Sequence, residues 1–168
     1  MKYIKNMNEA QMNLLEKELH ARLPYGIKGI ASVKKFVKKI VESSDAEFSY
    51  EEKKVDVEAE LVAIKYNDSI LLEYEPVDIL DNYSLKDFKP YLRPMSSMTK
   101  EELKELRDIF NGDIDFNEWG LDILNSDFKR FSYLELLAVF DWLNAHHFDY
   151  RGLIEKGLAL VAPDGIYN

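Results

Sequence analysis

The sequence of 168 residues contains no cysteine. Its absence excludes disulfide bonds, thiolate zinc sites, cysteine-ligated iron–sulfur clusters and cysteine nucleophiles. Long apolar runs are missing as well, since no stretch approaches the roughly 20 apolar residues of a membrane-spanning helix. Residues 1–8 show no apolar segment like that of a signal peptide. We therefore expect a cytoplasmic protein that does not engage a membrane.

Recognisable catalytic motifs are also missing. The chain has no glycine-rich phosphate loop, no nucleophile elbow and no paired-carboxylate signature. Residues 113–117 resemble the start of a calcium-binding loop, but Glu118 stands where that loop requires glycine. The sequence therefore predicts no metal and no cofactor, and it favours a protein that is not an enzyme.

The composition is that of a globular protein, with 46% hydrophobic and 32% charged residues. The net charge of −9 is unevenly distributed. Residues 1–44 contain nine basic and four acidic side chains, whereas residues 45–168 contain thirteen and twenty-seven. The acidic majority repels phosphate backbones and counts against general nucleic-acid binding. The basic first quarter remains a candidate for a local contact face.

Three helices are predicted by capping boxes, in which an N-cap side chain and a Glu or Gln three residues later satisfy each other's backbone N–H groups. The predicted helices span residues 9–22, 100–110 and 133–147, and a short fourth helix is expected between Asp149 and Gly157. In the first helix, Leu15 and Leu19 lie on the apolar stripe and Glu18 lies off it. The third helix is expected to be buried on more than one side. The three boxes pair Asn8 with Gln11, Thr99 with Glu102, and Ser132 with Glu135.

The segment between the first two helices has the period of β-strands. Residues 55–61 alternate, and a change of phase at Val62 indicates a bulge or a strand covered on both faces. A hairpin turn is predicted at residues 67–68, and residues 77–94 are expected to form one short strand and a turn bounded by Pro90 and Pro94. Residues 27–41 are compatible with a helix or a strand. We favour a strand paired with residues 48–66, which would bring lysines near Glu51 and Glu58.

These elements predict an α+β fold. The first part, residues 1–95, would combine the N-terminal helix with a small, curved antiparallel sheet, for which an SH3-like barrel is one candidate. Residues 96–168 would form a helical subdomain packed against it as one unit, because no flexible linker separates the two.

Two groups of polar residues are candidates for a functional site. His, Asp and Arg gather near the C-terminus and could serve a metal or a general base, although neighbouring helical residues point about 100° apart. Dipole complementation and helix capping explain the same residues more simply. Lysines surround Phe36 in the basic segment and could contact nucleic acid, or simply coat a solvated face. The first group comprises His146, His147, Asp149 and Arg151, and the second comprises Lys34, Lys35, Lys38 and Lys39.

Three segments are more distinctive than composition requires: residues 21–26 (ARLPYG), 89–99 (KPYLRPMSSMT) and 148–159 (FDYRGLIEKGLA). Over these segments the chain resembles a family of uncharacterised proteins from phages and mobile elements of gut bacteria. The resemblance implies a small accessory protein made inside a bacterial cell, and it assigns no catalytic role to any residue.

Three functional hypotheses follow. The first is a non-enzymatic protein-binding module that engages a host component, since the surface is acidic and rich in aromatic residues. The second is nucleic-acid binding by the basic N-terminal sheet. The third is a hydrolase that uses the His/Asp/Arg cluster.

Overall fold

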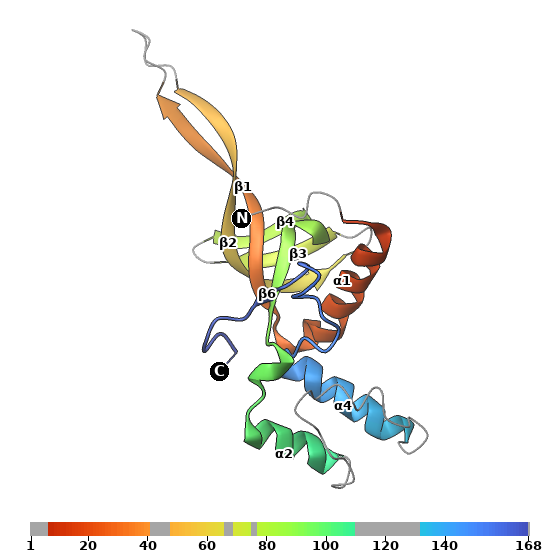
Figure 1. Cartoon of the computed structure of the whole chain (residues 1–168). Helices are drawn as coiled ribbons and strands as arrows, with labels where there is room; N and C mark the ends of the chain where they lie inside the picture. Colours follow the sequence, from red (N-terminus) through yellow and green to blue (C-terminus); the bar gives the residue numbers. More distant parts are fainter. Residues whose placement is uncertain (1–6, 41–47, 66–68, 75–76, 110–131, 168) are drawn as a thin grey trace.

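The computed structural model describes residues 7–40, 48–65, 69–74, 77–109 and 132–167, with the backbone alone for residues 36–40, 48–50 and 77–82. An N-terminal helix packs against a curled sheet, and two further helices lie at one end of the molecule (Figure 1). None of the helices in these ranges is long and apolar enough to cross a membrane.

The elements, in chain order, are α1 (Glu9–Arg22), η1 (Leu23–Tyr25), β1 (Lys28–Ile40), β2 (Phe48–Ile64), β3 (Ser69–Tyr74), β4 (Val77–Ser84), η3 (Leu85–Asp87), β5 (Phe88–Leu92), η4 (Met95–Ser97), α2 (Lys100–Ile109), α4 (Tyr133–Ala145) and β6 (Leu160–Val161).

The strands form one six-stranded sheet in the order β4-β3-β2-β1-β5-β6. Neighbouring strands are antiparallel except for β5 and β6, which pair in parallel. The predicted α+β class, with a helix ahead of a small curved sheet and helices later in the chain, is confirmed. The sheet is mixed because the chain returns after α4 to add β6 beside β5. The division into residues 1–95 and 96–168 stays a prediction.

The capping boxes begin the helices where the sequence predicts. The Asn8 side chain accepts a hydrogen bond from the Gln11 backbone N–H at 2.8 Å, and Gln11 accepts from the Asn8 N–H at 3.1 Å. The same reciprocal bonds join Ser132 with Glu135 and Thr99 with Glu102. Each box satisfies N–H groups that have no partner within the helix.

Two strand predictions are also confirmed. Residues 28–40 form β1, which pairs with β2 over its whole length. The register of β2 against β3 shifts between Leu61 and Ala63, which is the bulge that the change of phase at Val62 predicts. The turn predicted at residues 67–68 lies outside the described residues.

The prediction for residues 77–94 is wrong, because these residues form two strands and Pro90 lies inside β5, opposite Gly29. Backbone hydrogen bonds in antiparallel ladders join alternate pairs. The Leu61 N–H donates to the Ile27 oxygen, so odd-numbered residues of β1 bond to β2 and even-numbered residues face β5. Gly29 is odd-numbered, so the proline opposite it removes no ladder bond to β1.

Three expectations about helices also need correction. Residues 149–157 form turns and contain no helix. Leu134 and Leu137 of α4 are 74% and 47% exposed, so this helix is buried mainly on the side of Val139 and Leu143. Glu18 of α1 is 1% exposed and lies among the buried residues that it was expected to avoid.

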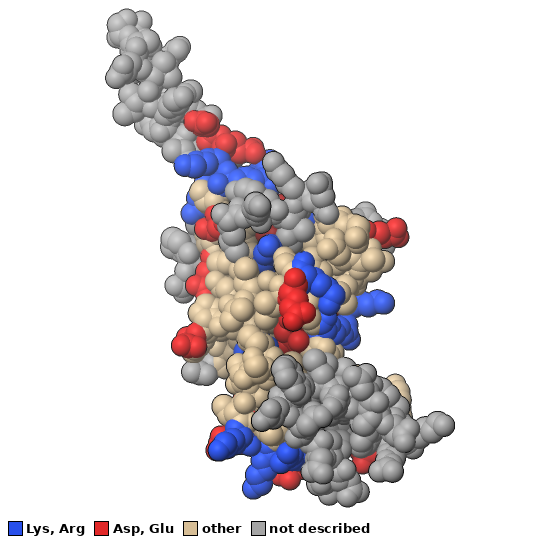
Figure 2. Space-filling view, viewed as in Figure 1, with Lys and Arg blue, Asp and Glu red and all other residues tan. Residues whose placement is uncertain are grey.

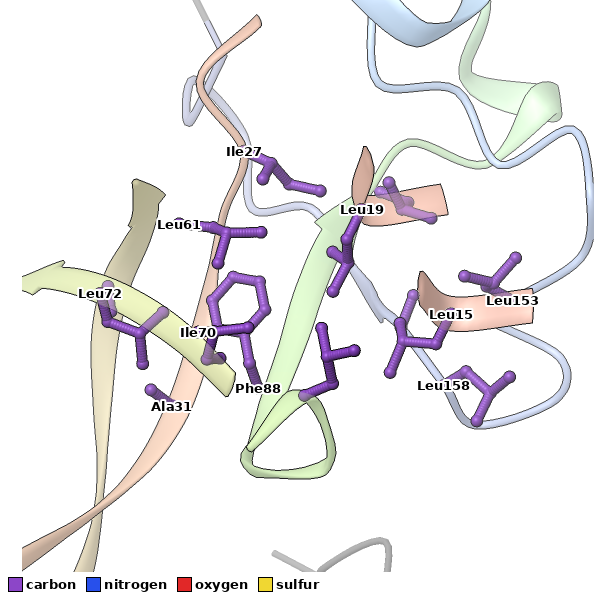
Figure 3. Close-up of a cluster of buried hydrophobic side chains, with 14 of the residues drawn as sticks. Leu15, Leu19, Ile27, Ala31, Leu61, Ile70, Leu72, Phe88, Leu153 and Leu158 are labelled. Atoms are coloured by element: carbon purple, nitrogen blue, oxygen red, sulfur yellow. The ribbon is translucent and has the colours of Figure 1, made fainter. Parts of the chain in front are cut away.

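The main hydrophobic core lies between α1 and the sheet (Figure 3). Leu15 and Leu19 of α1 face Phe88 and the inner side of the sheet, and Leu153 joins them from the C-terminal loop. A second cluster connects α2 with α4. Its buried members are Leu106, Val139, Leu143, Phe148 and Tyr150.

Candidate functional site

The outer parts of β1 and β2 form a two-stranded ribbon that projects from the body of the molecule (Figure 1). The last pair that faces the core is Val33 with Val55, where Val33 is 1% exposed. Seven further pairs follow, from Lys34 with Lys54 to Ile40 with Phe48. At about 3.4 Å per residue they extend the ribbon by about 24 Å. We call residues 34–40 and 48–54 the projecting ribbon.

The four lysines predicted as one contact face are divided between the two faces of this ribbon. Successive side chains of a strand point to opposite faces. Positions 34 and 38 therefore share one face and positions 35 and 39 the other. Lys34 and Lys35 are both exposed, and the backbone places Lys38 and Lys39 farther along the same strand. Strand β1 thus places two of these four lysine positions on each face of the ribbon.

Lysines at the base of the ribbon have partners within the molecule. The Lys34 Nζ lies 2.8 Å from a Glu52 carboxylate oxygen, and this hydrogen bond raises the pKa of Lys34. The Lys54 Nζ lies 3.3 Å from Asp87 Oδ1. The Lys35 Nζ lies 5.6 Å from the centroid of the Tyr74 ring, within range of a cation–π contact. Acidic and basic side chains accordingly lie side by side in the described part of the ribbon (Figure 2).

The C-terminal cluster is made of residues in four separate environments. His146 caps α4, and its Nδ1 lies 2.9 Å from the Trp142 carbonyl oxygen, while the two rings stack at 3.9 Å. Asp149 accepts hydrogen bonds from the backbone N–H groups of Leu153 at 2.7 Å and Ile154 at 2.8 Å. Asp149 thus acts as a cap, as predicted, but it caps a turn.

His147 is buried, with 2% of its surface exposed, and its φ of 56° is unusual for a residue other than glycine. Its ring stacks on Tyr167 with 3.6 Å between centroids. Burial, followed by the charge of the nearby Arg22, lowers the pKa of His147 to about 4. The imidazole is therefore neutral near pH 7, and its Nδ1 has no hydrogen-bond partner in the described part of the chain.

Arg151 belongs to a buried network that the sequence analysis missed. Its Nε lies 2.8 Å from Glu18 Oε1, and the other Glu18 oxygen binds Arg22 at 2.8 Å. Arg22 is fully buried and also donates to the Phe148 carbonyl oxygen at 2.7 Å. Weaker bonds reach the carbonyl oxygens of Leu143 and Asn144, so Arg22 ties α1 to the end of α4.

A signal for this network was present in the sequence. Glu18 and Arg22 are four residues apart in a helix, a spacing at which oppositely charged side chains meet. They also flank Leu15 and Leu19 on the same side of α1. An ion pair on the apolar side of a helix indicates burial, whereas the same pair on the polar side would indicate solvent exposure.

The cluster residues therefore do not converge on a common centre. His146, Asp149 and Arg151 each bind a different backbone or side-chain group, and His147 stacks in a fourth place. Residues 7–40, 48–65, 69–74, 77–109 and 132–167 contain no group of three His, Asp or Glu side chains that could hold a metal. The arrangement supports the structure of the C-terminal loop and its attachment to α1.

No family model, no curated protein and no solved structure matches the chain.

Proposed function

We propose that this protein is a non-enzymatic protein-binding module that contacts its partner through the projecting ribbon. The observation that carries the proposal is the continuation of the β1–β2 ladder for seven pairs beyond the last pair that faces the core. Ordering one residue costs about 1–2 kcal/mol of backbone entropy, and the described side chains of the ribbon, at positions 34, 35 and 51–54, are exposed. A contact surface gives such an extension a role that folding alone does not.

The charges at the base of the ribbon favour a protein partner over nucleic acid. Lys34 and Lys54 are each paired with a carboxylate, and Glu51 and Glu52 are exposed beside them. A phosphate backbone would have to displace these carboxylates and would meet a chain of net charge −9. Mixed charge of this kind suits a protein surface whose own charges are mixed. The resemblance to phage and mobile-element proteins makes a bacterial host component the proposed partner.

A ribbon-shortened variant tests the proposal. Residues 36–52 are replaced by Asn-Gly, so that a tight turn joins Lys35 to Lys53, which face each other as a hydrogen-bonded pair of the register. The full chain and the variant are used to capture proteins from host lysate, and each captured protein is then purified and its affinity measured. The expected result is a partner whose affinity falls at least about a hundredfold when the ribbon is shortened.

The matched control changes a distant exposed surface. A Leu134→Ser, Leu137→Ser variant alters the exposed side of α4 and should bind as the full chain does. Circular dichroism and thermal unfolding establish that both variants fold. If the ribbon-shortened chain keeps its affinity for every purified partner, the proposed function is wrong.

Nucleic-acid binding by the same ribbon is the second candidate. Six lysines occupy ribbon positions, and a two-stranded ribbon has the width to enter a DNA major groove. A titration of DNA and RNA over a range of salt concentrations tests this candidate. Binding that weakens steeply with salt would favour it, because lysines that contact phosphates release counterions. The lysines are Lys34, Lys35, Lys38, Lys39, Lys53 and Lys54.

A further inference from the structure

We infer that the place where β1 and β5 separate is a binding site for a tyrosine side chain. In this structure Tyr167 of the same chain fills the site, and a tyrosine-bearing segment of a partner protein takes its place when Tyr167 leaves. We call residues 163–167 the latch. The site goes beyond the proposed role of the projecting ribbon, because the residues that form it lie outside the ribbon.

The site begins where the ladder between β1 and β5 ends. The last pair is Gly29 with Pro90, so the next pair in the register would be Lys28 with Tyr91. Even-numbered residues of β1 direct their backbone groups toward β5. In a regular ladder, the Lys28 N–H would therefore donate to the Tyr91 carbonyl oxygen.

The Tyr167 hydroxyl stands between these two backbone groups. It accepts a hydrogen bond from the Lys28 N–H at 3.2 Å and donates to the Tyr91 carbonyl oxygen at 2.8 Å. The Lys28 carbonyl oxygen lies 3.2 Å from the same hydroxyl. Burial raises the pKa of Tyr167, so the hydroxyl keeps the proton that it donates. One side chain thus bridges a backbone donor and acceptor that would otherwise pair directly.

The ring of Tyr167 has a surface of its own in the site. It stacks on the His147 imidazole with 3.6 Å between centroids and 13° between the ring planes. Aromatic pairs of this kind contribute more than the area that they bury. A tyrosine therefore matches both parts of the site, since its ring stacks and its hydroxyl both donates and accepts. Phenylalanine would leave the two backbone groups unsatisfied.

The residues that carry Tyr167 to the site make few hydrogen bonds with the body. Pro163, Asp164 and Gly165 are exposed. The Ile166 N–H closes a turn on the Pro163 oxygen at 3.3 Å, and Gly165 has a φ of 79°, which glycine adopts without strain. Within the described chain, the hydrogen bonds from the latch to the body all come from the Tyr167 hydroxyl. Such segments open at a fraction of the cost of global unfolding.

The other residues of the site are held by contacts that do not involve the latch. Lys28 belongs to the ladder between β1 and β2, and Tyr91 pairs with β6. The Arg93 N–H donates to the His147 carbonyl oxygen at 2.8 Å. The site therefore remains when Tyr167 leaves. A tethered side chain has an effective concentration on the order of millimolar, so a competing partner needs contacts beside the ring as well.

The first test empties the site with Tyr167→Ala in the full-length, ¹⁵N-labelled protein. The probe is 4-methylphenol, which reproduces the tyrosine side chain, and the matched control is toluene, which lacks only the hydroxyl. The amide resonances of Lys28 and His147 report binding. We expect 4-methylphenol to bind with a Kd on the order of millimolar or lower. Toluene should bind at least about tenfold more weakly, because it leaves the backbone groups of the site unpaired.

The second test asks whether Tyr167 can be displaced. N-acetyl-tyrosinamide is titrated into Tyr167→Ala, Tyr167→Phe and the unaltered chain, and its apparent affinity should decrease in that order. The reason is that apparent affinity falls with the fraction of molecules whose site is free. We expect at least about a tenfold difference between Tyr167→Ala and the unaltered chain. The control Tyr133→Ala removes a tyrosine that is 74% exposed on α4 and should behave as the unaltered chain does.

Each outcome supports or overturns the inference. Failure of 4-methylphenol to shift the Lys28 and His147 resonances, or equal binding of 4-methylphenol and toluene, would overturn it. If Tyr167→Ala does not fold, Tyr167→Phe decides, and no gain in affinity for N-acetyl-tyrosinamide over the unaltered chain would overturn it. A dimer that Tyr167→Ala abolishes would assign the site to a second copy instead. The ribbon-shortened chain carrying Tyr167→Ala should bind 4-methylphenol unchanged, so this inference and the proposed function fail independently.

Discussion

Two ion pairs in this protein have the same length but very different burial. Replacing one member of each pair should therefore show how burial, and not distance, sets the contribution of an ion pair to stability. The Arg22 guanidinium and the Lys34 ammonium each lie 2.8 Å from a carboxylate oxygen, of Glu18 and Glu52 respectively. The side chains of the first pair are 0% and 1% exposed, and those of the second are 54% and 46% exposed. The perturbation is replacement of Arg22 or Lys34 by methionine, which keeps an unbranched chain and removes the charge.

The expected costs differ severalfold. Removing one member of a buried pair leaves an uncompensated charge and costs about 3–5 kcal/mol. In Arg22→Met, Glu18 would retain only Arg151, and the Phe148 carbonyl oxygen would lose its 2.7 Å donor. Water screens exposed pairs, so Lys34→Met should leave the free energy of unfolding nearly unchanged. Since small domains have about 5–15 kcal/mol of stability, the first change removes a large share of it.

Urea unfolding followed by circular dichroism and tryptophan fluorescence measures both costs. A double variant, Glu18→Leu with Arg22→Met, should be less destabilised than the sum of its two single variants by at least about 1 kcal/mol, because neither member is left unpaired. If Arg22→Met and Lys34→Met differ by less than about 1 kcal/mol, burial does not set the strength of the Arg22 network and the argument fails.

Three further predictions concern packing and pH. Gly29→Ala should lower the free energy of unfolding in urea by more than about 2 kcal/mol, because the added Cβ would lie 2.2 Å from the Lys89 backbone oxygen. The Cβ of Gly157→Ala would have no atom within 4 Å, so this variant should cost only about 1 kcal/mol, through its positive φ. The pKa of His147 is lowered from 6.5 to about 4, so about 3 kcal/mol of stability should be present above pH 6.5 and lost toward pH 4. His147→Asn, which tolerates a positive φ, should abolish this slope in unfolding measured across that range; an unchanged slope would exclude His147 as its source. The hydrogen bond from Arg93 lowers the pKa of Glu102 from 4.5 to about 2, so the stability that Glu102 contributes should be present above pH 4.5 and lost toward pH 2. Glu102→Gln should therefore reduce the pH dependence of the unfolding free energy between pH 4.5 and pH 2, and leave it unchanged at higher pH.

Elements with a local signal were predictable from the sequence. The capping boxes identify the first residues of α1, α2 and α4 because the two partners lie three residues apart. The change of phase at Val62 predicts the bulge because it moves successive side chains to the other face. In each case the residues that interact are neighbours in the chain, so the pattern is complete within one short segment.

Elements that depend on distant partners were not predictable in the same way. Pro90 is compatible with β5 because its partner in the sheet is Gly29, which lies about sixty residues earlier in the sequence. Residues 149–157 form turns held by Asp149, by the Arg93–Phe148 bridge and by packing of Leu153 into the main core. Their local pattern suits a helix equally well, and contacts from other elements decide between the two.

The candidate site shows the same division. The lysines of β1 were visible as a basic run, but their separation onto two faces follows only once the segment is a strand. His146, His147, Asp149 and Arg151 are adjacent in sequence, and adjacency suggested a common centre. Their actual partners come from α1, α4 and the C-terminal residues, so the sequence grouped side chains that the fold separates.

Buried and exposed charges are distributed unequally between the body of the molecule and the projecting ribbon. In the body, buried charges such as Glu18 and Arg22 are bound to one another or to backbone oxygens, and changing them should alter stability first. On the projecting ribbon, the side chains of Lys34, Glu51, Glu52 and Lys53 are exposed to solvent. A partner bound there would gain mainly by covering apolar surface and by complementing these charges. Substitutions of these exposed residues should therefore change the affinity for the proposed partner while leaving the free energy of unfolding nearly constant, and substitutions in the Arg22 network should do the reverse.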